Sequence, residues 1–414
     1  MITMWQFSRI FLLLLACYCL FVPSISWAHT SNVAAKDSPE PMISEWVLKR
    51  LNQAKKHIVE EKYDEARALL TELLKSLKRH PYEAALTKQA IGFSFSMEDK
   101  YEEAIPHFKA ALPGLSSSYQ QTQKTRYDLA QLYFIEEQYP QSIDLLEAWI
   151  KDNDSTPPKA FILLANAYSL SDKPAKAIPL VKKAIEIEKT EFKEDWYRLL
   201  LSLHLQLSQY KESESLLSVL VSRFPDKDEY WLRLAALQIE QEKMTLAAAT
   251  YEIAWKKGLL TTQQELLRLV HLLLHVELPE RAAQVLTKEM PQRIEANQKH
   301  WRLLGNAWLM AREYDQAVTA LEKAAAQAEH GKLHDRIGRI YYEQQQWQAS
   351  IDFLSRALEK GELTAPAQTH LLIGQAYIEL DNKQQAKASL QRAAEFKGTK
   401  RQALQWLGYL EDKR

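Results

Sequence analysis

A small residue that recurs at nearly constant intervals restricts the fold of this chain more than any other feature of its sequence. Ala or Ser occupies ten positions that lie 33 to 38 residues apart, and helix-like apolar spacing surrounds each of them. We call these residues the anchors of ten repeats, numbered from the N-terminus. They are Ala66, Ala104, Ser142, Ala177, Ser213, Ala247, Ala282, Ala317, Ser350 and Ala386.

Two further positions keep the same register in every repeat. The apolar position, four residues after the anchor, holds Leu70, Phe108, Leu146, Val181, Leu217, Tyr251, Leu286, Leu321, Leu354 and Leu390. The small position, twelve residues before the anchor, holds Ala54, Gly92, Ala130, Ala165, Leu201, Ala235, Val270, Gly305, Gly338 and Gly374. Small residues allow two helices to approach closely, and large residues are expected to fill the gap between neighbouring repeats. The pattern therefore predicts an all-α chain of about ten helical hairpins.

Repeat eight shows the pattern most fully, with Trp301, Leu304, Gly305, Trp308, Ala317 and Leu321. This order of residue types and the period of about 34 residues resemble the tetratricopeptide repeat. The resemblance extends from Ile43 to the end of the chain, and it implies a right-handed α-solenoid. Residues 43–398 are then the repeats, and the amphipathic segment 399–414 is expected to form a helix that caps repeat ten.

Composition agrees with a helical protein that has short turns, since the 414 residues include only 10 Gly and 15 Pro. One longer connection, residues 113–118, has a turn-forming sequence and is expected to protrude as a flexible loop. The 53 basic and 53 acidic residues cancel, so no bulk field favours nucleic acid as a partner.

The first 28 residues differ from the rest of the chain. Arg9 is their only charged residue, residues 10–22 form an apolar run, and small residues at Ser26 and Ala28 stand where a signal peptidase reads them. These features predict a secretory signal that is cleaved before His29, followed by a flexible lead-in over residues 29–42. The mature chain is then expected to have no membrane span, with an uncleaved N-terminal anchor as the alternative.

Both cysteines, Cys17 and Cys19, lie inside this predicted signal. The mature chain is therefore expected to contain no disulfide and no thiolate ligand. Leu14, Leu15, Ala16 and Cys17 also resemble a bacterial lipobox. This leaves lipid anchoring at Cys17 open as a second alternative.

No set of residues that would support catalysis or bind a cofactor stands out. The sequence has no recognisable nucleophile turn and no Gly-rich phosphate loop. His271 and His275 stand four apart, as two metal-binding imidazoles on one helix can, but only Leu residues lie between them. We expect a protein that is not an enzyme and that has neither cofactor nor metal, with an envelope enzyme as a remote alternative.

The resemblance to tetratricopeptide proteins further implies a concave groove, lined mainly by the first helix of each hairpin at positions that include those three before, one after and four after the small position. These positions include Phe93, Tyr127, Asn166, Arg198, Arg302, Asn306, Asp335, Arg339 and Tyr342. The mixed lining suits an extended peptide or a helix of a protein partner. Arg302 and Asn306 resemble the residues with which some tetratricopeptide relatives clamp peptide carboxylates, and ordinary solvated side chains are the alternative interpretation.

A narrower resemblance involves residues 229–235, 256–260, 265–269 and 403–411. These segments are similar to those of periplasmic tetratricopeptide proteins that accompany some TonB/ExbB/ExbD systems of Gram-negative bacteria. The resemblance implies a periplasmic, non-catalytic scaffold that supports uptake of iron–siderophore or haem, with TonB, ExbB or ExbD subunits as partners. A scaffold in outer-membrane or cell-envelope assembly, or in polysaccharide export, is the alternative.

Overall fold

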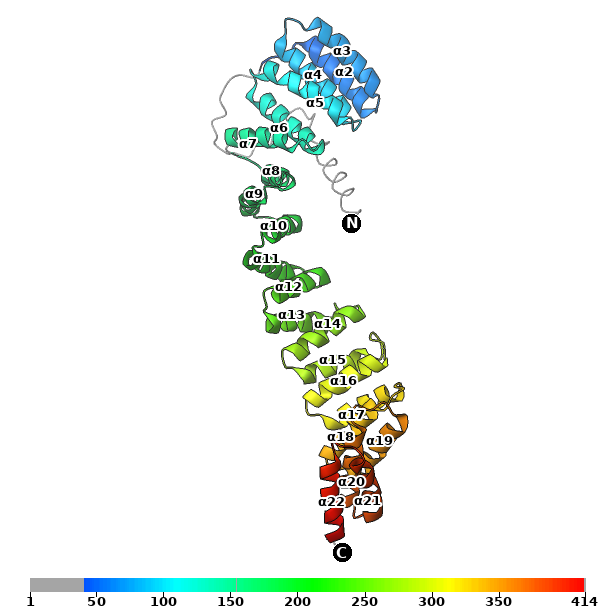
Figure 1. Cartoon of the computed structure of the whole chain (residues 1–414). Helices are drawn as coiled ribbons and strands as arrows, with labels where there is room; N and C mark the ends of the chain where they lie inside the picture. Colours follow the sequence, from blue (N-terminus) through cyan, green and yellow to red (C-terminus); the bar gives the residue numbers. More distant parts are fainter. Residues whose placement is uncertain (1–40, 154, 413–414) are drawn as a thin grey trace. The chain divides into compact units, whose positions relative to one another are not determined.

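The computed structural model describes residues 41–153 and 155–412. All the regular structure in these residues is helical (Figure 1). The predicted secretory signal, with Cys17 and Cys19, lies outside the described residues, as does the lead-in up to residue 40. None of the described helices combines the length and the hydropathy needed to cross a bilayer.

The chain divides into two compact units between Ser213 and Glu214, inside helix α11 (Tyr210–Arg223). The first unit contains α2 (Glu45–Val59), α3 (Tyr63–Ser76), α4 (Pro81–Ser96), α5 (Tyr101–Ala111), α6 (Tyr119–Ile135), α7 (Tyr139–Asp152), α8 (Pro158–Leu170), α9 (Pro174–Ile187) and α10 (Glu194–Gln206). The second contains α12 (Asp228–Glu240), α13 (Met244–Lys256), α14 (Gln263–His275), α15 (Pro279–Glu289), α16 (Gln298–Met310), α17 (Tyr314–Ala326), α18 (Lys332–Glu343), α19 (Trp347–Lys360), α20 (Pro366–Glu379), α21 (Lys383–Ala394) and α22 (Lys400–Asp412). Helices α2 to α9 and α12 to α21 pair in order as nine hairpins within the described residues, and the left-handed turn at Ser208 joins α10 to α11 in the same register.

One turn geometry joins the two helices of every hairpin. The residue five before each anchor has a left-handed backbone, with φ between 54° and 62°: Glu61, Asp99, Glu137, Asp172, Ser208, Glu242, Glu277, Arg312, Gln345 and Asp381. The next N–H donates to the carbonyl oxygen five residues earlier, at 2.8–3.0 Å, which satisfies an end carbonyl of the first helix. None of the ten is Gly, so each turn carries the steric cost of a side chain in this conformation.

Close packing at the small position explains the register within a hairpin. A Cβ added to Gly305 would lie 2.6 Å from Leu321 Cγ, and one added to Gly338 would lie 2.6 Å from Leu354 Cγ. At the anchors Ser142 and Ser350 the hydroxyl donates to the carbonyl oxygen of the small position at 2.8 Å, whereas the Ser213 hydroxyl donates to the carbonyl oxygen of Gln209. The large residue at the apolar position thus packs against the small position of its own hairpin, and not only between neighbouring repeats as the sequence suggested.

The expectation of a protruding loop at residues 113–118 is wrong. The segment begins with a 3-10 helix, η1 (Leu112–Leu115), and Leu115 is fully buried against Ala85 and Ala111. A Cβ on Gly114 would lie only 2.5 Å from the carbonyl oxygen of Pro81, so the backbone itself is packed against α4. The apolar Leu115 inside a polar turn sequence is the reason.

The C-terminal helix α22 covers the last hairpin. Trp406, Leu407 and Leu410 pack against a cluster that includes Leu390 and Ala393 of α21. This covers apolar surface that the last repeat would otherwise expose. The expected fold class, an all-α solenoid of about ten hairpins closed by a C-terminal helix, is confirmed.

Candidate functional site

The first helices of repeats eight and nine carry charged side chains at equivalent positions, but these side chains differ in whether they are paired. We call the residues three before, one after and four after the small position the first-helix face. In the second unit, α16 supplies Arg302 and Asn306, and α18 supplies Asp335, Arg339 and Tyr342. The five residues share one structural unit but differ in how far they are already paired.

Arg302 and Asn306 have unused hydrogen-bonding capacity. Arg302 is exposed and forms no ion pair with any described residue. Asn306 is half-buried, and its Oδ1 is shielded from solvent without a hydrogen-bond donor in the described chain. A buried amide oxygen that lacks a partner costs free energy, which a ligand with a suitable donor would recover.

Arg336, on α18, adds a second cation next to this face. Desolvation lowers the pKa of the Arg336 guanidinium, and the nearby positive charge of Arg302 lowers it further. Two neighbouring positive charges favour an anion placed between them. Sequence reasoning missed Arg336 because it stands two before the small position, outside the pattern from which the face was predicted.

Asp335 and Arg339 are paired with each other. Arg339 Nε donates to Asp335 Oδ2 at 2.7 Å, and the hydroxyl of Thr369 on α20 donates to Asp335 Oδ1 at 2.7 Å. Tyr342 also reaches α20, where its hydroxyl donates to Gln375 Oε1 at 3.2 Å, and burial raises its pKa. The predicted face of repeat nine therefore ties α18 to α20.

In the first unit, Phe93 and Tyr127 are half-buried and use their rings in packing. Phe93 lies against the apolar clusters of repeats one and two. The Tyr127 ring is 4.9 Å from that of Trp149, and burial, followed by the charge of Asp128, raises the pKa of Tyr127 to about 12. Both rings contribute to the core as well as to the predicted face.

Asn166 and Arg198 are the other predicted residues of the first unit. Both are half-buried, and neither has a hydrogen-bond or ion-pair partner among the described residues. They lie on α8 and α10, two successive first helices.

His271 is exposed on α14, as is His275. Within the described residues, no group of three or more His, Cys, Asp or Glu side chains is arranged to hold a metal ion. The pair thus lacks the further protein ligands that zinc sites have.

These features define a helical-repeat protein with a partly open, basic first-helix face. A family model described as tetratricopeptide repeat matches residues 367–399, which correspond to repeat ten. That match covers repeat ten alone, and the other repeats share its register of anchor, small and apolar positions.

Comparison with solved structures gives similarity in fold. The chain is similar to a tetratricopeptide repeat protein from Parabacteroides merdae, with 14% identity, a TM-score of 0.39, and coverage of 69% of this chain and 94% of the other. It is also similar to YrrB, described as a TPR protein with an unusual peptide-binding site, with 15% identity, a TM-score of 0.36, and coverage of 44% and 90%. No curated protein matches the sequence. Similarity at this level carries no argument about partners.

Proposed function

We propose that this protein is a non-catalytic adaptor that binds an acidic segment of a protein partner on the first-helix face of repeats eight and nine. The observation that carries the proposal is the closeness of two cations on successive first helices, since the charge of Arg302 lowers the pKa of the Arg336 guanidinium. A carboxylate of the partner segment would accept from both guanidiniums, and a backbone N–H of the same segment would donate to the unsatisfied Asn306 Oδ1. Charge-assisted hydrogen bonds of this kind are the stronger ones in proteins.

We further propose that the adaptor works in the periplasm and supports a TonB/ExbB/ExbD complex in iron–siderophore or haem uptake. The support for this role is the predicted secretory signal and the resemblance of the four sequence segments. A scaffold in envelope assembly or polysaccharide export uses the same face and is the second candidate.

The test is crosslinking in intact cells followed by mass spectrometry, with wild type and the double variant Arg302→Ala/Asn306→Ala. We expect TonB-system subunits in the wild-type sample and about tenfold less of them with the double variant, since the loss of one charge-assisted hydrogen bond and of the Asn306 acceptor together costs about 1.4 kcal/mol or more. Arg401→Ala, which removes an exposed arginine on α22, is the matched control and should leave the yield unchanged. Equal yields from all three proteins would refute binding at this face, and recovery of assembly machinery would favour the second candidate.

A further inference from the structure

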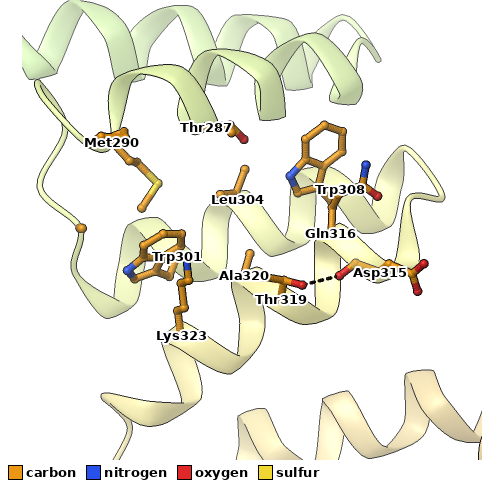
Figure 2. Close-up of a pocket in the computed structure, with 12 residues that line it drawn as sticks. Thr287, Met290, Trp301, Leu304, Trp308, Asp315, Gln316, Thr319, Ala320 and Lys323 are labelled. Carbon is orange, nitrogen blue, oxygen red and sulfur yellow. Dashed lines mark hydrogen bonds between the residues drawn. The ribbon is translucent and has the colours of Figure 1, made fainter.

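A cavity of about 620 Å³ lies in the second unit between α15, α16 and α17 (Figure 2). Trp301, Leu304 and Trp308 line it from α16, while Ala320 and Lys323 line it from α17. Successive residues of an α-helix are about 100° apart around its axis. Trp301, Leu304 and Trp308 therefore project from another side of α16 than Arg302 and Asn306 do. The cavity is therefore separate from the first-helix face.

The residue three after the anchor explains why repeat eight has this space. Here it is Ala320, whereas repeats one, three and four have Leu69, Leu145 and Leu180 in the same register. A large side chain at this position would project toward the two tryptophans. Ala320 leaves that volume empty.

Repeat nine shows what occupies the equivalent space. Its residue in register with Ala320 is Phe353, whose ring centroid lies 6.3 Å from that of His334 and 5.5 Å from that of Tyr341. His334 and Tyr341 are in register with Trp301 and Trp308. Arg356, in register with Lys323, lies over the Phe353 ring at 5.4 Å. An aromatic ring beneath a cation is thus the filling that this protein itself uses.

Repeats six and seven fill the same space by other means. In repeat six the Thr250 hydroxyl donates to Gln238 Oε1 at 2.8 Å, and both side chains are buried. In repeat seven the positions equivalent to Trp301, Trp308 and Ala320 hold Leu266, Leu273 and Val285, and each of these side chains is at most 1% exposed. Repeat eight differs from both, because Trp301 and Trp308 both line an open cavity.

Charge at the cavity rim defines the occupant further. The Lys323 ammonium lies 4.3 Å from the Trp301 ring centroid and has no carboxylate within ion-pair distance among the described residues. Asp315 also lines the cavity, at the opposite end of α17 from Lys323 (Figure 2). A negative charge on the occupant is therefore favoured next to Lys323 and disfavoured next to Asp315.

We propose that this cavity is a second binding site, which takes an aromatic side chain of a protein partner between Trp301 and Trp308. An acidic residue next to that side chain pairs with Lys323. The inserted ring does for repeat eight what Phe353 does within repeat nine. The site is independent of the acidic segment assigned to the first-helix face.

The probes are short capped peptides, titrated against the mature full-length chain by ligand-observed NMR. The sequence acetyl-Gly-Glu-Phe-Gly-amide is expected to bind, and replacement of its Phe by Ala is expected to abolish binding. Replacement of its Glu by Lys should weaken binding about threefold or more, because the exposed Lys323 charge then repels the peptide. Phenylacetate tests a free aromatic acid, and binding as tight as that of the peptide would overturn the assignment to a protein segment.

Protein variants locate the binding. Ala320→Phe places in repeat eight the residue that repeat nine has, and it should lower affinity for the Glu-Phe peptide at least about tenfold while raising the melting temperature. Ala320→Leu, which copies Leu145, serves as the second filling variant should the first fail to fold.

Two control variants test where the peptide binds. Ser389→Phe places a phenylalanine at the equivalent position of repeat ten and should leave the affinity for the peptide unchanged. Arg302→Ala/Asn306→Ala should also leave it unchanged, which separates this site from the first-helix face. Undiminished binding to a folded Ala320→Phe or Ala320→Leu protein refutes the proposal.

Discussion

Repeats eight and nine have the same hairpin but differ in how completely each satisfies its own side chains. Repeat nine fills the space beside its first helix with Phe353 and pairs Asp335 with Arg339. Repeat eight leaves a cavity at Ala320 and leaves Arg302 without an ion pair among the described residues. Both repeats share two features: the large residue at the apolar position packs against the glycine at the small position, and the turn residue has a left-handed backbone.

The comparison separates what a repeat needs for folding from what it can leave open. Both hairpins keep Gly against Leu at the closest approach of their helices. Beyond that contact, a repeat is supported by its neighbours, so it can lose one filling residue and remain folded. Positions that are filled in one repeat and vacant in the next are therefore the places to look for ligands.

The largest effect on stability is expected when the Phe353 ring is removed from repeat nine. Phe353→Ala should lower the free energy of unfolding by about 2–3 kcal/mol, because a half-buried ring and its aromatic contacts are lost. Urea denaturation measures this. Phe353→Leu, which copies repeats one and three, should cost about 1 kcal/mol at most. If Phe353→Ala left the free energy of unfolding unchanged, the ring would not stabilise repeat nine, and this difference between the two repeats would be lost.

A smaller difference is expected between the charged residues at equivalent positions. Asp335→Ala should destabilise the protein by about 1 kcal/mol, because Arg339 and Thr369 lose their common acceptor. Arg302→Ala should change stability by less than about 0.5 kcal/mol, since it is exposed and unpaired within the described chain. Thermal melts of the two variants decide, and equal destabilisation would show that the faces do not differ in pairing.

The shared turn should respond equally in both repeats. Arg312→Gly and Gln345→Gly should each stabilise the protein by about 0.5–1 kcal/mol, because glycine adopts the left-handed conformation without steric cost. Ala311→Gly, one residue earlier at φ −79°, is the matched control and should destabilise it. A gain in only one repeat would indicate that the two turns are not equivalent.

The smallest effect concerns pH. Burial, followed by the charges of Lys360 and Arg356, lowers the pKa of His334 below its usual value of 6.5. The unfolded chain then takes up the proton more readily, so stability falls as the pH drops below about 6.5 toward the folded-state pKa. Trp301, in register in repeat eight, does not titrate. Melting temperatures at about pH 7.5 and about pH 5.5 should differ less for His334→Phe than for wild type, and an unchanged difference would assign the pH dependence elsewhere.

The number and register of the hairpins could be predicted from sequence because they depend on residues within one repeat. The spacing from Gly305 to Ala317 is enough to place two helices and their turn. The packing of Leu115 in η1 could not be predicted from the pattern of one repeat, because it depends on Ala85 from an earlier helix. Pairing on the first-helix face depends on neighbours in the same way: Arg339 looks like Asn306 by register, yet Asp335 one turn earlier and Thr369 on the next first helix decide its role.

The vacancy at Ala320 shows a further limit of pattern reading. Trp301 and Trp308 match the repeat pattern and pack against the core cluster, yet both also line the cavity. The signal was available in the sequence, since Ala stands where several repeats have Leu or Phe. It becomes meaningful only when His334, Tyr341 and Phe353 are seen to fill the same place in repeat nine.

The contacts that define a hairpin all join residues close in sequence. Gly305 meets Leu321 sixteen residues later, and the hydroxyl of Ser350 reaches Gly338 across twelve. Contact order of this kind is low, and low contact order is associated with fast folding. Each hairpin can therefore form once a few tens of residues are available, so a chain that emerges gradually can fold from its N-terminus onward without waiting for its C-terminal helix.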